Sequence, residues 1–195
     1  VVLEVKEGQT GTIRFAAGYS SSFGVTGLLE FTQRNFDIAD LPTSMDDLLG
    51  GTGFAGGGQF LRLRVAPSAR RQSYTADFRE PYVFGYEFGA GISALKVTTN
   101  LRSWTEERNG LVFSVDKRFD PFLARLKLDM SEINIGKISV GAPADAYHVE
   151  GQNFLLSLTP SIGYDGRDID LFFPVNGVMT QLSYEMAGGP LGGDW

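Results

Sequence analysis

The chain has 195 residues, a net charge of -6, 25 glycines, one histidine and no cysteine. These numbers exclude a disulfide framework, a thiolate or histidine-cluster metal site, and a basic nucleic-acid-binding surface. The hydrophobic fraction of 43% suits a folded domain, and no apolar run is long enough for a transmembrane helix.

Strict alternation of apolar and polar residues dominates the chain. In residues 11–19, Ile13, Phe15 and Tyr19 share one face, and Thr12 and Arg14 share the other. This period of two predicts a half-buried strand. The same reasoning predicts nine candidate strands in all, at 11–19, 25–34, 58–66, 72–80, 84–98, 108–119, 122–139, 151–164 and 177–187.

The connections between these strands differ greatly in length. Tight turns with Pro or Gly are expected at 67–71, 80–85 and 119–121. The connection at 35–57 is long, and Ser44 is placed to cap a short helix over 45–49, which Gly50 and Gly51 would end. A second irregular stretch covers 140–150.

The length of the strands favours a membrane barrel over a soluble sandwich. Strands of soluble proteins average about 5–6 residues, whereas strands that cross a bilayer need about 9–11. In a barrel the apolar face meets lipid and the charged face lines the lumen, whereas a sandwich buries the apolar face in its core. Because single-chain bacterial barrels have even strand numbers, nine strands indicate either a count that is off by one or part of a larger barrel.

One ion pair is predicted on the charged face. If the turn near 67–72 pairs Ala66 with Ser73, Arg62 lies directly opposite Asp77. The alternative is that both side chains are simply solvated.

The sequence contains no convincing catalytic, metal or cofactor site. The Gly-rich segment 50–58 lacks the G-K-[ST] that a phosphate-binding loop needs. Asp165, Asp168 and Asp170 lack EF-hand spacing, and a solvated turn is the simpler interpretation. His148 lies near Asp145 and Glu150, but no G-x-S-x-G nucleophile motif accompanies it. We therefore expect a non-enzymatic protein without a cofactor.

Several motifs resemble the BamA family of outer-membrane assembly factors. The opening resembles the family's step from the last POTRA domain into a G-x-G-Y-S-S strand, followed by a strand ending in N-[FL]. The matching residues are Glu7, Gly11, Gly18, Tyr19, Ser20, Ser21, Gly24, Asn35 and Phe36. A later segment resembles the family's Y-x-x-x-F-x-[ED]-P-[YW] hairpin, with Tyr74, Phe78, Glu80, Pro81 and Tyr82. The segment from Asn176 to Asp194 resembles a mid-barrel strand and its G-G-D loop.

The chain also departs from the family pattern. Ala16 replaces the first glycine of G-x-G-Y-S-S, residues 36–57 replace a short turn, and the R-G-F loop motif of the second half of the barrel is absent. The resemblance therefore implies an all-β fold: the first half, about 8–9 strands, of an antiparallel 16-strand transmembrane β-barrel, which would be an open curled sheet in isolation. Residues 1–10 would end the last POTRA domain, and 11–195 would form the N-terminal half of the barrel.

The resemblance also implies an orientation and a location in the outer membrane of a Gram-negative-type bacterium. Since POTRA domains are periplasmic, the first strand would run outward. The connections at 36–57, 81–84 and 120–121 would then be periplasmic, and those at 20–24, 67–71, 99–107 and 140–150 extracellular.

The implied function is folding and insertion of other barrel proteins without catalysis. The family's first strand forms a lateral seam to which a client strand adds through backbone hydrogen bonds. Here that strand would comprise Gly11, Thr12, Ile13, Arg14, Phe15, Ala16, Ala17, Gly18 and Tyr19. The alternative for its small residues is that they fit a curved barrel wall. Implied partners are the outer-membrane bilayer, unfolded outer-membrane protein clients and accessory lipoproteins, with no nucleic acid.

Two further functions stay open at this point. Within the same superfamily, the chain could belong to a two-partner secretion or translocation-assembly pore. From a different class, it could be a small outer-membrane barrel enzyme or a ligand-binding barrel, which would require a sealed barrel of about eight strands.

Overall fold

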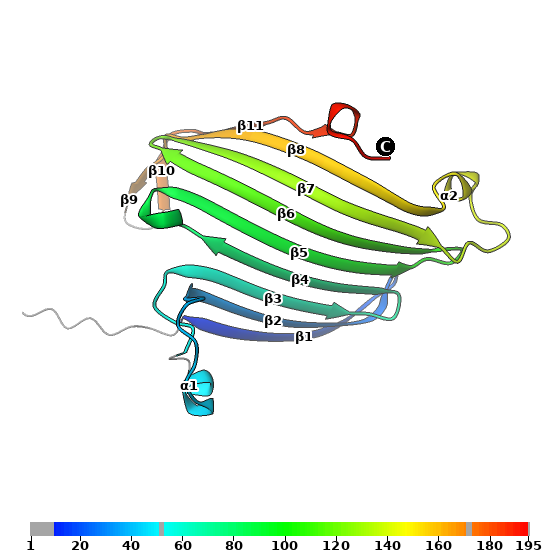
Figure 1. The fold of residues 1–195 in the computed structure, drawn as a ribbon, viewed down its shortest axis with the longest axis horizontal. Helices are drawn as coiled ribbons and strands as arrows, with labels where there is room; N and C mark the ends of the chain where they lie inside the picture. Colours follow the sequence, from blue (N-terminus) through cyan, green and yellow to red (C-terminus); the bar gives the residue numbers. More distant parts are fainter. Residues whose placement is uncertain (1–9, 51–52, 171–172, 195) are drawn as a thin grey trace, which may run out of the picture.

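A computed structural model describes residues 10–50, 53–170 and 173–194 of the chain. Its main feature is a curled antiparallel sheet whose strands follow one another in sequence order (Figure 1). The strands of this sheet are β1 (Gly11–Ser20), β2 (Gly24–Phe36), β3 (Gln59–Pro67), β4 (Arg71–Glu80), β5 (Phe88–Asn100), β6 (Thr105–Phe119), β7 (Phe122–Gly136), β8 (Gly151–Asp165), β11 (Met179–Ser183) and β12 (Met186–Ala187).

The remaining elements lie in the connections. They are α1 (Met45–Gly50), α2 (Ala144–His148), the 3-10 turns η1 (Val83–Gly85) and η2 (Gly189–Leu191), and the hairpin of β9 (Asp168–Asp170) with β10 (Phe173–Asn176). Among the described residues, no helix has the length and apolar character needed to cross a membrane.

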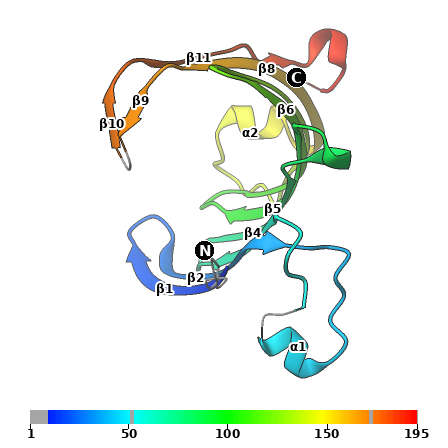
Figure 2. The same ribbon diagram turned by 90° about the vertical axis from the view of Figure 1, so that its left-hand side faces the viewer.

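The sheet is open, with β1 at one end of the strand order and β11 at the other. Figure 2 shows the sheet end-on as an incomplete ring, with α2 inside the curve and α1 outside it. This all-β, unclosed arrangement confirms the predicted fold class. It is not the sealed eight-strand barrel that the small-enzyme and ligand-binding alternatives would need.

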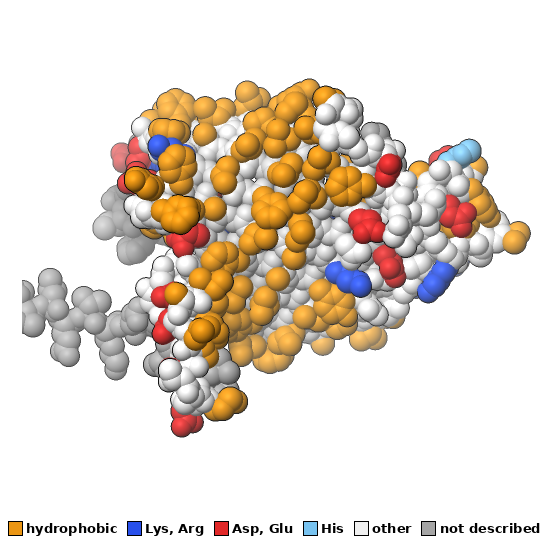
Figure 3. Space-filling view, in the orientation of Figure 1, with side chains coloured by type: hydrophobic (Ala, Val, Ile, Leu, Met, Phe, Trp, Pro, Cys, Tyr) orange, Lys and Arg blue, Asp and Glu red, His pale blue; other side chains and the backbone are white. Residues whose placement is uncertain are grey.

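The two faces of the sheet differ in chemistry. Hydrophobic side chains spread over most of the convex face, with charged side chains toward its α2 end (Figure 3). Few apolar side chains of the described residues are shielded from solvent. The register places the charged residues of neighbouring strands together on the other face: Arg14 lies opposite Glu30, Arg62 opposite Asp77, and Asp116 opposite Arg125. The alternation seen in the sequence thus separates an apolar outer wall from a charged inner wall.

The predicted strands agree with the observed ones except at some ends. The strand predicted from residue 84 begins at Phe88, because Val83–Gly85 forms a 3-10 turn in which Phe84 has a φ of 54°. The strand predicted to reach residue 139 ends at Gly136. Ser44 does cap α1, since its Oγ accepts a hydrogen bond of 3.0 Å from the Asp47 backbone N–H.

The strand predicted at 177–187 is divided into β11 and β12, and both pair with β8. The interruption lies opposite Pro160. The Pro160 carbonyl accepts a hydrogen bond from the Tyr184 N–H (3.1 Å), so the missing N–H of Pro160 also faces this edge. A proline cannot donate to the ladder, and the pairing therefore breaks at this residue. The preceding hairpin of β9 and β10 was not predicted.

Candidate functional site

Strand β1 is paired along its whole length on one side only. Its register with β2 runs without a bulge from Gly11 opposite Gln33 to Ser20 opposite Gly24. In the part of the chain that the structure describes, no strand pairs with its other side. The predicted seam strand is therefore an open sheet edge.

The hydrogen-bond pattern identifies which residues of β1 face this edge. The Arg34 N–H donates to the Thr10 carbonyl at 3.2 Å, and antiparallel ladders alternate between bonded and non-bonded pairs. The even-numbered residues of β1 thus bond to β2, and the odd-numbered ones direct their N–H and C=O groups away from it. On the far side of β2, the Ala69 N–H donates to the Val25 carbonyl at 3.3 Å, as this alternation requires.

The edge-facing residues are Gly11, Ile13, Phe15, Ala17 and Tyr19. Their side chains share the apolar outer face of the sheet and are highly exposed: 60% for Ile13, 78% for Phe15 and 80% for Tyr19. An unpaired backbone edge beside exposed apolar side chains is a template for adding another strand.

Gly18 of β1 is not explained by backbone geometry. Gly18 does not have a positive φ, and a Cβ added there would meet only the Thr26 Oγ1 at 3.5 Å, which is ordinary contact. Curvature of the wall therefore does not require glycine at this position. Its effect is to weaken the side-chain packing and the strand propensity of β1.

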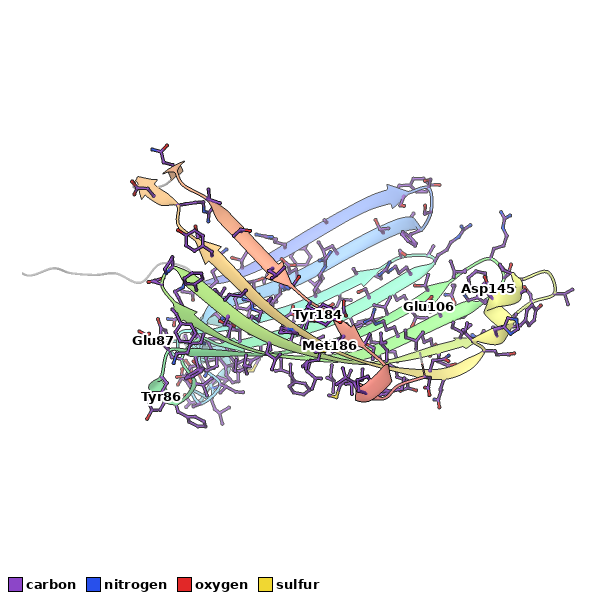
Figure 4. The ribbon with its side chains drawn as sticks, turned by 90° about the horizontal axis from the view of Figure 1, so that it is seen from above. Tyr86, Glu87, Glu106, Asp145, Tyr184 and Met186 are labelled. Atoms are coloured by element: carbon purple, nitrogen blue, oxygen red, sulfur yellow. The ribbon has the colours of Figure 1, made fainter. Side chains whose placement is uncertain are left out.

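The opposite edge of the long strands is covered. Strand β8 pairs with β11 at residues 161–165 and with β12 at residues 157–158. Tyr184 and Met186 lie along this edge in Figure 4. Nearer the α2 end, the Asp194 carboxylate accepts a hydrogen bond from the Phe154 N–H, and the Asp194 N–H donates to the Phe154 carbonyl at 2.8 Å. The sheet therefore ends on this side in two short strands, β11 and β12, whereas its other edge is the continuous strand β1.

Arg62 and Asp77 lie together on the concave face. Arg62 Nε donates to Asp77 Oδ2 at 2.9 Å, and Nη2 lies 2.8 Å from the same oxygen. The pairing of Ala66 with Ser73 is the register from which the ion pair was predicted. On the same face, Arg14 of β1 approaches Glu30 of β2 at 3.4 Å.

Sequence reasoning missed two larger networks on this face. Asp116 accepts two hydrogen bonds from Arg79 at 2.8 Å each and lies 3.7 Å from Arg125. Further along β6 and β7, Arg108 donates to the Ser131 hydroxyl at 3.0 Å, and that hydroxyl donates to Asp129 at 2.7 Å. The alternation of β6 and β7 places these residues on the charged face, but their pairing requires the register of both strands.

A family model of the Omp85 superfamily domain matches residues 54–195. The chain belongs to the Omp85 superfamily. This Omp85 chain is similar in fold to a crystal structure of BamA from Haemophilus ducreyi that lacks POTRA domains 1–3. The structural alignment covers 95% of this chain, with a TM-score of 0.59 and a sequence identity of 16%. The match spans 35% of that BamA chain. No curated protein sequence matches this Omp85 chain.

The hairpin motif of this Omp85 chain has a structural role in the turn after β4. Glu80 accepts a hydrogen bond of 2.8 Å from the Gln59 side chain and another of 2.9 Å from the Tyr82 N–H. Phe78 packs edge-to-face on Phe36, with ring centroids 6.2 Å apart. Pro81 begins the turn, and Tyr82 is exposed. The motif joins the start of β3 to the end of β4.

The described residues of this Omp85 chain include no group of three or more His, Cys, Asp or Glu side chains placed to hold a metal ion. Asp165 instead pairs with Arg167, with both hydrogen bonds at 2.8 Å. His148 ends α2. Asp145 of the same helix and Glu106 lie toward one end of the sheet, and Tyr86 and Glu87 lie toward the other (Figure 4).

Proposed function

We propose that this chain forms the seam-bearing half of an outer-membrane barrel that folds and inserts other β-barrel proteins. The observation that carries the proposal is the open edge of β1, where five successive odd-numbered residues direct backbone groups outward. A client strand would pair with these groups by β-augmentation, in which main-chain hydrogen bonds supply the affinity.

Placement in the outer membrane is supported by the two faces of the sheet. The convex face carries the hydrophobic side chains and would meet lipid, whereas the concave face carries the ionic networks and would line an aqueous lumen. In this orientation β1 runs from the periplasm outward. The connections that contain α1, η1 and the β9–β10 hairpin are then periplasmic, and α2 is extracellular.

The same proposal covers the domain division of the chain and its partners. The end of the last POTRA domain would occupy residues 1–10, of which 1–9 lie outside the described residues, and the N-terminal half of the barrel would occupy 11–195. Unfolded outer-membrane proteins would be the clients, and assembly lipoproteins would be accessory partners. Strand addition uses backbone atoms, so the function needs no catalytic side chain or cofactor.

Two adjacent alanines provide a sharp test of the seam. Ala17 faces the open edge, whereas Ala16 bonds to β2 opposite Leu28. Proline lacks an N–H, so Ala17→Pro in the full-length protein removes one edge donor and spares the β1–β2 ladder. Ala16→Pro removes a ladder bond instead. Client folding into phospholipid vesicles and protease resistance of β1 are measured for both variants.

The expected result is that Ala17→Pro slows client folding at least tenfold while β1 remains resistant to protease. Ala16→Pro should expose β1 to protease, because the Ala16 N–H bonds to β2 whereas the Ala17 N–H faces the open edge. Client folding at the wild-type rate by a folded Ala17→Pro variant would contradict the proposal. Export of a soluble passenger through the lumen, with no effect on client folding, would instead favour the secretion-pore alternative.

A further inference from the structure

A single lysine interrupts the hydrophobic convex face near the η1 end of the sheet. The register places Lys117 of β6 in one row with Phe88 of β5 and Ala124 of β7. Its Nζ lies 4.3 Å from the centroid of the Phe88 ring and 5.0 Å from that of the Phe119 ring. The ammonium group is therefore held between two aromatic faces.

Among the described residues, Lys117 has no Asp or Glu carboxylate oxygen within 4.0 Å, in contrast to the arginines of the concave face that pair with Asp77, Asp116 and Asp129. The carboxylate of its neighbour Asp116 points to the opposite face, where Arg79 and Arg125 contact it. A cation on an apolar wall that lacks a protein counter-ion is suited to bind an anion from outside the protein.

A shallow, mainly apolar groove contains this lysine. It is lined on the convex face by Phe88, Val115, Lys117, Phe119, Ala124, Leu126 and Pro160. The register row of Val115, Leu126 and Pro160 lies two residues along the strands from the row of Lys117, toward the middle of the sheet. The small side chains of Ala124 and Pro160 leave room between larger neighbours. The groove therefore extends from Lys117 toward the hydrophobic middle of the convex face.

We propose that this groove binds one glycerophospholipid of the surrounding bilayer, with its phosphate on Lys117 and an acyl chain along Val115, Leu126 and Pro160. This inference rests on the proposed placement in a membrane. Three features favour a lipid over a protein segment. The groove continues the apolar wall, and Lys117 lies on the η1 side of the Val115, Leu126 and Pro160 row. Further aromatic residues, Phe122 and Tyr164 with ring centroids 5.3 Å apart, lie at the same end of the sheet. Aromatic residues typically mark the level of lipid headgroups.

The test uses the full-length protein in bilayer discs of phosphatidylethanolamine and phosphatidylglycerol. A photoreactive amino acid at Ala124 reports on the groove, and the same probe at Ala94, another small residue on the convex face, reports on unselective lipid contact. Covalently captured phospholipid is measured by mass spectrometry. Lys117→Gln removes the proposed phosphate contact, and Lys96→Gln removes a lysine on the same face far from the groove.

We expect several-fold more phospholipid captured at Ala124 than at Ala94. Lys117→Gln should reduce capture at Ala124 to the Ala94 level, Lys117→Arg should preserve it, and Lys96→Gln should leave it unchanged. Discs of a phosphate-free galactolipid should abolish the difference between the two positions. Equal capture at both positions, or capture unaffected by Lys117→Gln, would overturn the lipid site.

The two proposals fail in different ways. A barrel that enters the bilayer and folds clients, but captures lipid equally at Ala124 and Ala94, retains the proposed function and loses only the lipid site. A folded protein that does not enter the bilayer at all would overturn the membrane placement and, with it, the lipid site.

Discussion

Arg79 of β4 and Asp116 of β6 are joined by two hydrogen bonds of 2.8 Å, although β5 lies between their strands. The contact is possible because Gly89 is the residue of β5 opposite Asp116. A Cβ on Gly89 would lie 2.5 Å from Arg79 Nη2 and 2.9 Å from Asp116 Oδ2. The absence of a side chain at one position therefore lets an ion pair connect two strands that are not neighbours.

We predict that Gly89→Ala destabilises the barrel by about 1–2 kcal/mol, because the methyl group displaces a charge-assisted hydrogen-bonded pair. Urea unfolding of the full-length protein in detergent micelles measures the change. Gly136→Ala is the matched control, since a Cβ there meets nothing within 4 Å. Equal stability of the two variants would show that the Arg79–Asp116 contact is not needed.

The Arg62–Asp77 pair, which the sequence predicts, and the Arg79–Asp116 pair, which it does not, should contribute differently to stability. Asp116 is only 8% exposed and faces two arginines, so Asp116→Ala leaves these cations together without a carboxylate and should cost about 2–3 kcal/mol. The Arg62 side chain is 44% exposed, so Arg62→Ala should cost less than about 1 kcal/mol. The same unfolding measurement, repeated at high salt, should weaken the Arg62 effect further. A larger loss for Arg62→Ala than for Asp116→Ala would contradict this ranking.

These pairs also show how far sequence reasoning reaches. The Arg62–Asp77 register depends on one short turn, and a turn of known length fixes the pairing of its two strands. Arg79 and Asp116 are separated by the turn that contains η1, by the whole of β5, and by the turn at residues 101–104 before β6. An error of one residue in either turn moves one side chain to the opposite face, so this contact could not be derived from alternation alone.

The open edge was predictable in part. Alternation locates β1 and assigns its faces, but it does not give the direction of each backbone group, which follows from the hydrogen bond between Arg34 and Thr10. The division of β11 from β12 depends likewise on which side of β8 the nitrogen of Pro160 faces. Alternation describes side chains, whereas both of these features are properties of the backbone ladder.

Two glycines near the seam should respond oppositely to substitution. A Cβ at position 18 makes only ordinary contact with the Thr26 Oγ1, and threonine raises strand propensity, so Gly18→Thr should leave the fold unchanged or up to about 1 kcal/mol more stable. Gly24 has a φ of 76°, and Gly24→Ala should cost about 1 kcal/mol or more because of backbone strain. Thermal unfolding of the full-length variants measures both. If weak packing of β1 assists strand exchange, Gly18→Thr should also slow client folding, whereas unchanged client folding would limit the seam's function to its backbone groups.

The final prediction concerns the long connection between β2 and β3, whose two ends lie together. The Asn35 carbonyl accepts a hydrogen bond of 3.0 Å from the Gly56 N–H, and its side chain accepts one of 2.8 Å from the Gly58 N–H. The Asp37 N–H donates to the Phe54 carbonyl at 2.9 Å, and Phe54 stacks on Phe36 with ring centroids 5.5 Å apart.

Replacement of residues 38–53 by a two-residue Asn-Gly turn should therefore keep β2, β3 and the Phe36–Phe54 stack, because Asp37 and Phe54 are already paired. The free energy of unfolding of the full-length protein should change by less than about 1 kcal/mol. Asn35→Ala is the informative comparison, since it removes the side-chain contact that holds the end of the connection and should be more destabilising than the deletion. A barrel that loses client folding after the deletion, yet keeps its stability, would assign the connection a role at the periplasmic end of the seam. A barrel that no longer folds would show instead that residues 38–53 support the sheet itself.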